Sequence, residues 1–148
     1  GGKDSESMKI LILNGPNLNL LGRREPEIYG TATYGDLCAE LESLAEELGI
    51  SLEIRQSNHE GALIDALQQT DAAGAVLNAG GYTHTSVALR DACAAIAIPC
   101  VEVHLTDPET REPFRRVSYL RDVCAATFQG EGFESYRKAI RFLAARGA

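Results

Sequence analysis

Short apolar runs alternate along the chain with longer segments in which apolar residues recur every three or four positions. Runs rich in Leu, Ile and Val are typical of buried β-strands, and the longer segments are typical of amphipathic helices. Five stretches are therefore predicted to be strands: KILILNG (9–15), SLEIRQS (51–57), GAVLNAG (74–80), PCVEVHL (99–105) and CAATFQG (124–130).

Four helices are predicted over residues 33–49, 60–71, 85–97 and 133–147. The first has defined ends, because Thr33 and Asp36 have capping spacing and Gly49 follows the last apolar position. The third is predicted to be capped by Thr85 or Ser86. This strand and helix alternation predicts an α/β fold with a flavodoxin-like, doubly wound sheet of five parallel strands and helices on both faces.

A chain of 148 residues, 45% of them hydrophobic, can bury the core of one domain but not of two ordinary ones. Residues 1–7 (GGKDSES) are small and polar, and are expected to be a disordered leader or a cloning remnant before a single catalytic domain, 8–148. The net charge of −7 argues against nucleic-acid and membrane partners, because both require a basic surface.

The four cysteines lie in apolar stretches, without CxxC spacing or a histidine at zinc-finger spacing: Cys38, Cys93, Cys100 and Cys124. They are expected to be small buried side chains in a reducing compartment, with disulfide or metal-binding use as the alternative. The longest apolar run, ACAAIAIPCV, is too short to span a membrane, and no signal peptide is apparent. A cytoplasmic location is therefore expected.

Polar segments follow the first, third and fourth predicted strands, at 14–30, 78–86 and 102–116. The carboxyl ends of parallel strands meet at one edge of a sheet, so these segments should line one rim. They carry ten candidate residues: Asn17, Arg23, Arg24, Tyr29, Asn78, His84, His104, Arg111, Arg115 and Arg116. A folding role alone explains this set poorly, and the arginines favour an anionic ligand.

Within VEVHL, strand alternation places Glu102 and His104 on one face. A neighbouring carboxylate can fix the tautomer of a histidine and keep it protonatable. The alternative is a strand-end histidine that only bonds a loop carbonyl, but the glutamate and the arginines that follow favour a chemical role. His59 has no such neighbours and is expected at the surface.

In NAGGYTHTS, glycines before a helix could help hold an anion, or could form only a tight turn.

The segment GRREPEIYG suits a hinged lid, because Gly22 and Gly30 flank it and Tyr29 is not placed for packing. A tyrosine acting as a base would need its pKa lowered by ~3 from the reference of ~10, which takes about 4 kcal/mol. One cation ~4 Å away, at an effective dielectric constant of ~20, supplies that order of energy. The lid offers Arg23 and Arg24.

The stretches NGPNLNLLGRREPEIYG, NAGGYTHTS, VALRDA and VEVH, in this order, resemble the type II 3-dehydroquinate dehydratases, and the similarity runs from about Met8 to Arg146. The resemblance implies the same flavodoxin-like fold, trimers packed into a dodecamer, and no metal or organic cofactor. It also implies a small-molecule substrate, the cyclic hydroxy acid 3-dehydroquinate, which loses water by anti elimination through an enolate. The pathway would be shikimate and aromatic amino acid biosynthesis, or quinate breakdown.

By that resemblance, Tyr29 is the expected base, Arg24 lowers its pKa and closes over the ligand, and Asn17 holds a water at the enolate oxygen. His104, oriented by Glu102, is expected to protonate the departing hydroxyl.

The resemblance also implies a substrate-binding set of six residues. These are Asn78, His84, Leu105, Thr106, Arg115 and, from a neighbouring subunit, Asp91. The chain departs from the family at Thr106-Asp107, where Ser-Asn is frequent, and at Tyr82, which is expected to narrow the rim.

Four alternatives are compared with this assignment: a different dehydration mechanism and three other functions. A Schiff-base dehydratase needs a buried lysine, but the three lysines, Lys3, Lys9 and Lys138, lie away from the rim. FMN binding would need a different loop after the first strand and stacking aromatic rings. A hydrolase would have to use Ser86, His84 and Asp91 without a GxSxG elbow. A non-enzymatic module that binds the cyclic acid without turnover is the last alternative.

Overall fold

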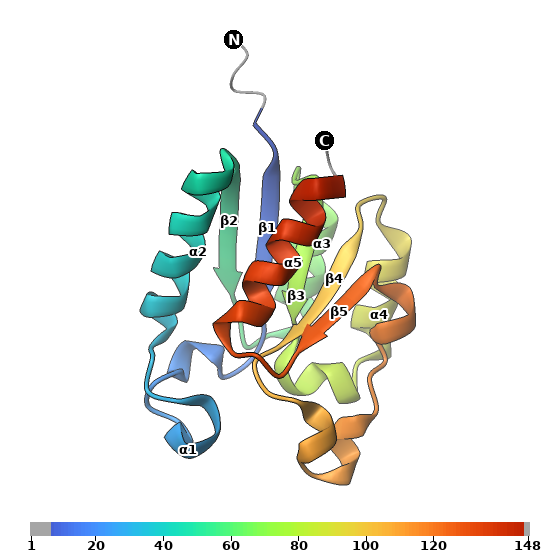
Figure 1. Ribbon diagram of the computed structural model, residues 1–148. Coiled ribbons are helices and arrows are strands. Elements are labelled where there is room, and N and C mark those ends of the chain that lie inside the picture. The colour runs from blue at the N-terminus through green and yellow to red at the C-terminus, as the bar shows by residue number, and fades with distance from the viewer. Residues whose placement is uncertain (1–6, 147–148) are drawn as a thin grey trace.

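Five parallel strands form one sheet in the order β2-β1-β3-β4-β5 (Figure 1). The strands are β1 (Lys9–Asn14), β2 (Ser51–Gln56), β3 (Gly74–Asn78), β4 (Cys100–His104) and β5 (Ala126–Gln129). The coordinates are a computed structural model that describes residues 7–146. β1 lies between two partners, with Ile10 in register with Leu52 on β2 and Gly74 on β3. This order is that of a doubly wound, flavodoxin-like sheet, which confirms the predicted fold class.

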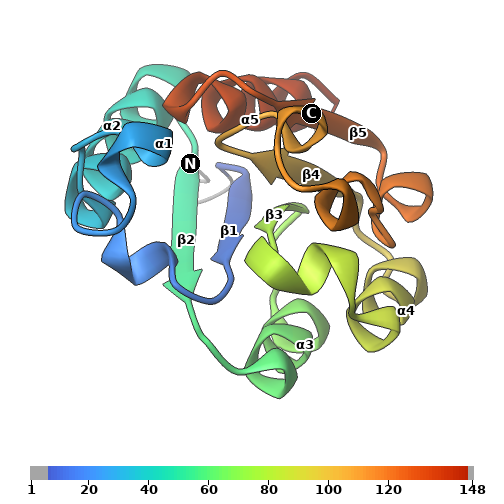
Figure 2. The ribbon, with the colours of Figure 1, turned by 90° about the horizontal axis from the view of Figure 1, so that it is seen from below.

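Helices cover both faces of the sheet, as seen along the strands in Figure 2. α2 (Tyr34–Leu48) and α5 (Phe133–Arg146) pack on one face, and α3 (Glu60–Gln69) and α4 (Val87–Ala95) pack on the other. In β1, Ile10 and Ile12 belong to the first core cluster and Leu11 and Leu13 to the second. A central strand that is buried on both faces must be apolar at every position, which explains the run KILIL.

The predicted ends of the first helix are confirmed. The Thr33 side chain accepts a hydrogen bond from the Asp36 backbone, the Asp36 carboxylate accepts one from the Thr33 backbone, and Gly49 ends the helix with φ 70°. Of the two candidate caps for α4, the structure uses Ser86, whose hydroxyl accepts from the Leu89 N–H.

Short helical turns fill the segments that were expected to be open loops. They are η2 (Leu18–Leu20), α1 (Pro26–Tyr29), η3 (Gly80–His84), η4 (Pro108–Thr110), η5 (Pro113–Arg116) and η6 (Arg121–Val123). The glycines of NAGGYTHTS begin the separate turn η3, which lies between β3 and α4, so the tight-turn alternative describes the backbone of this segment.

Two further expectations concern the ends of the chain and the membrane. Residues 1–6 of the expected leader lie outside the described residues, so their predicted disorder is untested. Over residues 7–146, no helix combines the length and the apolar character required to cross a bilayer.

Candidate active site

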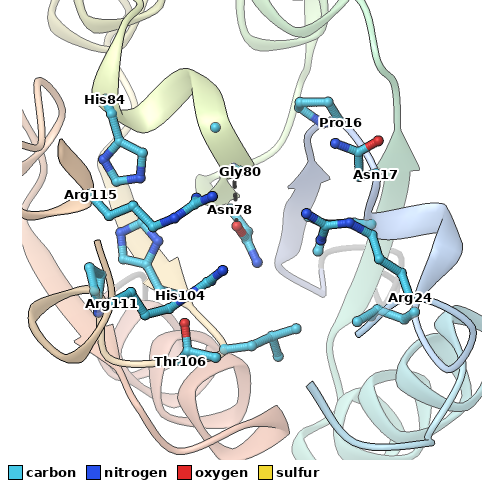
Figure 3. A pocket seen from close by; sticks show the side chains of 15 residues that line it. Pro16, Asn17, Arg24, Asn78, Gly80, His84, His104, Thr106, Arg111 and Arg115 are labelled. Carbon is cyan, nitrogen blue, oxygen red and sulfur yellow. Dashed lines mark hydrogen bonds between the residues drawn. The ribbon is translucent and has the colours of Figure 1, made fainter. Parts of the chain in front are cut away.

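A pocket of about 160 Å³ lies at the carboxyl ends of β1, β3 and β4 (Figure 3). All three polar segments contribute to it, as the strand order requires. The lining residues are Pro16, Asn17, Leu18, Leu21, Arg24, Asn78, Gly80, Gly81, His84, His104, Leu105, Thr106, Pro108, Arg111 and Arg115. Eight of the eleven predicted site residues are thus brought together around one cavity: Asn17, Arg24, Asn78, His84, His104, Leu105, Thr106 and Arg115.

Gly15 allows the backbone segments that follow β1 and β3 to lie in direct contact. Its backbone N–H donates to the Asn78 carbonyl at 2.8 Å, and a Cβ at this position would lie 2.5 Å from the Ala79 carbonyl oxygen. A side chain would therefore push the two loops apart. Beyond this contact, Asn17 takes a left-handed backbone conformation (φ 72°) and its N–H donates to the Asn58 side chain at 3.0 Å. The Asn17 side chain is left exposed at the pocket.

Asn78 is fixed from below by a buried hydrogen-bond chain. Its amide donates to the Tyr136 hydroxyl at 2.9 Å, and that hydroxyl donates to the Asn14 side chain at 2.6 Å. Burial raises the pKa of Tyr136, so the phenol stays neutral and can donate. The Asn78 side-chain oxygen accepts from the Gly80 N–H. The orientation of the Asn78 amide is therefore set by α5 and η3, not by a ligand.

His104 and Glu102 form the predicted pair at the end of β4. His104 Nε2 lies 2.6 Å from Glu102 Oε2, and both side chains are buried. With Nε2 engaged, Nδ1 is the ring nitrogen that remains for the pocket. The other strand face, with Val101 and Val103, belongs to the core beneath α2 and α5, as the alternation predicts.

The Glu102 carboxylate is ionised although it is 0% exposed. Burial opposes the charge, but the hydrogen bonds and charges of His104, Ser118 and Arg121 outweigh it and lower the pKa to about 2. The Ser118 hydroxyl donates to Oε2 at 2.7 Å, and the Thr127 hydroxyl donates to Oε1 at 3.0 Å. An anion is thus held permanently beside the His104 ring.

His84 faces the pocket with a defined tautomer. Its Nδ1 lies 2.7 Å from the Val117 carbonyl, which can only accept, so Nδ1 carries the proton and Nε2 is left to interact with a ligand. Burial lowers the pKa of His84, with His104 and Arg115 acting in the same direction. A neutral ring with a free lone pair can accept a hydrogen bond from a hydroxyl.

Three arginines give the pocket its positive character: Arg24, Arg111 and Arg115. Arg115 Nε binds Glu112 at 2.7 Å, and Arg111 Nε lies 4.0 Å from the same carboxylate oxygen. Arg111 was only one of five rim arginines in the sequence and was not selected as a site residue. Its spacing of four residues before Arg115 was the available signal: Arg111 directly follows η4, and Arg115 lies within the next turn, η5.

Three predicted site residues are not among the residues that line this pocket. Glu102 acts from behind His104. Asp91 is exposed on α4, away from the pocket of its own chain, so its proposed reach into a neighbouring subunit stays a prediction. Tyr29 ends α1 and its backbone is described, but its side chain lies outside the described part of the structure.

The expectation that Tyr82 narrows the rim stays a prediction. Its hydroxyl donates to the Asn58 carbonyl at 2.9 Å, and Tyr82 is not among the residues that line the pocket. Asp107, the other departure, accepts from the Glu109 N–H and caps η4.

The rival chemistries find little support in the site. Ser86 caps α4 and its hydroxyl donates to Glu60, and it does not line the pocket. Among the described side chains, no Phe or Tyr ring lines the pocket to stack on a flavin. Of the two lysines that the structure describes, Lys9 pairs with Asp71 at the opposite end of β1 and Lys138 pairs with Glu131.

Cysteines and metal-ligating groups show no second centre within residues 7–146. The four cysteines are unpaired; Cys93 and Cys100 are buried as expected, whereas Cys38 and Cys124 are only half-buried. No group of three or more His, Cys, Asp or Glu side chains in this part of the chain is arranged to hold a metal ion.

Comparison with known proteins matches this geometry to one family. The family model described as Dehydroquinase class II matches residues 8–144. The 3-dehydroquinate dehydratase of Bordetella avium (strain 197N) is 53% identical over 136 residues, covering 90% of this chain and 94% of that protein. The catabolic 3-dehydroquinase of Podospora anserina is 46% identical over 153 residues, covering 93% of this chain and 94% of that protein.

A solved structure agrees with the sequence relatives. The type II dehydroquinase of Butyrivibrio crossotus has a TM-score of 0.91 to this chain at 43% identity, covering 93% of this chain and 97% of its own. The chain therefore belongs to the class II dehydroquinase family, the type II 3-dehydroquinate dehydratases, which are hydro-lyases.

Proposed function

We propose that this chain converts 3-dehydroquinate to 3-dehydroshikimate by anti elimination of water through an enolate, with Tyr29 as the base and His104 as the acid. The observation that carries the proposal is the pocket itself. It joins a histidine backed by an ionised carboxylate to three arginines and two amide side chains, at the strand ends where ligands of this fold bind.

The hydrogen bonding of His104 supports its proposed role as the acid. Nε2 is occupied by Glu102, so the proton given to the departing hydroxyl is the one on Nδ1. The ionised carboxylate stabilises the imidazolium before the transfer, and neutral imidazole remains bonded to Glu102 after it.

The base role of Tyr29 rests on Arg24 and on the family resemblance. Arg24 lines the pocket and its guanidinium lies 3.3 Å from Glu25. A ligand that closes the pocket would exclude water and strengthen the attraction between this cation and a phenolate. Asn17, exposed at the same edge, would hold a water at the enolate oxygen.

The remaining lining groups fit a polyhydroxy acid. Asn78 and the Nε2 atom of His84 offer a donor and an acceptor to ring hydroxyls. Arg115, with the backbone at Leu105 and Thr106, would hold the carboxylate, because a guanidinium fork matches two carboxylate oxygens.

We further propose that the chain assembles into trimers, packed as a dodecamer. Four large apolar side chains are exposed beside the pocket: Val87, Phe114, Val117 and Tyr119. Val87 lies one helical turn before Asp91 on α4, so a subunit that covers this patch would receive Asp91 near its own pocket. A cytoplasmic location stays a prediction.

The test is direct. Dehydration creates a conjugated enone, so purified protein mixed with 3-dehydroquinate should show rising near-ultraviolet absorbance without added metal and in the presence of borohydride. Binding of 3-dehydroquinate by calorimetry without any absorbance change would leave the ligand-binding module as the better account. Light scattering on the same sample measures the oligomer.

A further inference from the structure

Arg121, at the start of η6, is a second cation on the buried carboxylate of Glu102. Its Nε lies 3.3 Å from Oε1, whereas His104 takes Oε2 at 2.6 Å. The charge of Glu102 is therefore shared between a ring that can lose its proton and a guanidinium that cannot.

The guanidinium is itself held in place from the other side. Arg121 NH2 donates to the Gln129 side-chain oxygen at 2.8 Å, and the Gln129 amide reaches the Asp107 carboxylate at 3.4 Å. Asp107 directly follows Thr106, which lines the pocket. The network runs from β4 through η6 and β5 to the segment that would bind substrate, so Arg121 is placed by more than its contact with Glu102.

Other ionisable groups around the pair do not duplicate this charge. Cys93 on α4 and Cys124 before β5 lie near Glu102, but their pKa values are raised, so both thiols are neutral. Across the pocket, His84 has a lowered pKa and is neutral, and Arg115 is bound to Glu112.

The remaining neighbours are also accounted for. Asp122, next to Arg121, is paired with Arg90 on α4. Arg121 is therefore the permanent cation that contacts the carboxylate directly.

We propose that Arg121 is a positioning residue for the acid: it locks Oε1 so that Oε2 faces His104, and it offsets part of the carboxylate charge so that His104 gives up its proton more readily. The proposal rests on the proposed function where it calls His104 the acid. The sharing of charge, however, can be measured without turnover.

The first test is the pH dependence of turnover in Arg121→Gln, which removes the charge but keeps amide donors. We expect the alkaline limb, where the acid loses its proton, to move to higher pH by about half a unit to one unit, the partial exposure of Arg121 limiting the shift. Turnover near neutral pH should fall about three- to tenfold. Arg121→Lys should keep the limb near its wild-type position, because it keeps the charge.

Two matched variants separate charge from structure. Thr127→Val removes a neutral hydrogen bond to the same Oε1 atom and should move the limb by less than Arg121→Gln does, because no charge is lost. Arg141→Gln removes an arginine charge from exposed α5 and should change neither limb nor turnover. A shift in Thr127→Val as large as that in Arg121→Gln, or any shift in Arg141→Gln, would contradict the assignment to Arg121.

A substrate-free measurement separates this proposal from the proposed function. In protein labelled with ¹³C-histidine, the pH at which half of the His104 rings are protonated should rise in Arg121→Gln by the same amount as the limb. If wild-type protein does not dehydrate 3-dehydroquinate, the proposed function fails while this titration still decides the role of Arg121. A midpoint within about 0.2 pH unit of wild type would overturn the proposal, even if turnover dropped.

Discussion

The two sides of the pocket differ in how the chain holds them. On the side of β3 and β4, Asn78, Glu102 and His104 are buried, and their hydrogen-bond partners come from α5, η6 and β5. On the side of the β1 exit, residues 17–30 form single turns, and Asn17 and Glu25 have positive φ values of 72° and 46°.

This difference assigns separate tasks to the two sides. The strand-end side is preorganised, so its side chains can orient a ligand without paying for reordering on binding. The exit segment has the short turns and glycine hinges of an element that can close over a ligand. Removing a side-chain group on the strand-end side should therefore lower both the stability and the turnover, whereas removing a side-chain group on the exit side should lower the turnover alone.

The largest effect is expected from Tyr29→Phe. Loss of the proposed base should lower kcat about 10²- to 10⁴-fold, because general base catalysis contributes that much, while the melting temperature stays unchanged. Tyr82→Phe removes the same group from a residue outside the pocket lining and serves as the control. Near-wild-type kcat in Tyr29→Phe would show that the base is another residue.

The next effect is the acid sensitivity that Glu102 confers. Its pKa is lowered from 4.5 to about 2 in the folded chain, so its contribution to stability is complete above pH 4.5 and is lost as the pH falls through about 2. The shift corresponds to about 3 kcal/mol. Urea unfolding at fixed protein concentration should show a smaller acid loss in Glu102→Gln than in wild type.

The control for that experiment is Glu46→Gln, on the exposed face of α2. It should leave the acid dependence as in wild type. Parallel curves for wild type and Glu102→Gln between about pH 5 and pH 2 would mean that the buried carboxylate is not the source.

Tyr136→Phe probes the strand-end side without touching the pocket. Removing the hydroxyl leaves the Asn14 oxygen and one Asn78 N–H without their buried partner, which should lower the unfolding free energy by about 2 kcal/mol. KM should rise as Asn78 loses its fixed orientation. Tyr34→Phe, whose hydroxyl accepts a 3.3 Å bond from Asn14, should have a smaller effect.

The smallest effect separates two glycines of the exit segment. Both have positive φ, but a Cβ on Gly22 would lie 2.9 Å from the Thr31 carbonyl oxygen, whereas a Cβ on Gly30 meets nothing within 4 Å. Gly22→Ala should lower kcat/KM about tenfold, from roughly 1 to 2 kcal/mol of strain, and Gly30→Ala should lower it less. If kcat/KM fell equally in the two variants, the close contact between residue 22 and the Thr31 carbonyl could not be the cause.

Much of the fold was predictable from the sequence, because its determinants are local or follow a simple period. The continuous apolar run of β1 indicated a buried strand, and Thr33, Asp36 and Gly49 marked both ends of α2. Because side chains alternate between the two faces of a strand, the pattern VEVHL correctly predicted that Glu102 and His104 share one face.

What the sequence did not predict depends on contacts between distant segments. The bond between Tyr136 and Asn14 joins residues 122 positions apart, and Arg121 reaches Glu102 from a turn with no recognisable periodicity. The Tyr82 hydroxyl likewise bonds the Asn58 carbonyl, 24 positions away, and no local pattern reveals this contact. Short 3₁₀ turns such as η3 were likewise missed, since glycine-rich stretches also fit open loops.

The Glu102 carboxylate has roughly four positions at which it can accept a hydrogen bond, and four donors fill them: His104, Ser118, Arg121 and Thr127. A carboxylate that is saturated in this way cannot pass protons between the interior and the imidazole. In the proposed reaction the enzyme ends each cycle with one proton too many on Tyr29 and one too few on His104. These protons have to be exchanged with solvent through the mouth of the pocket. Tyr29 and His104 should therefore return to their starting protonation states only after the product has left.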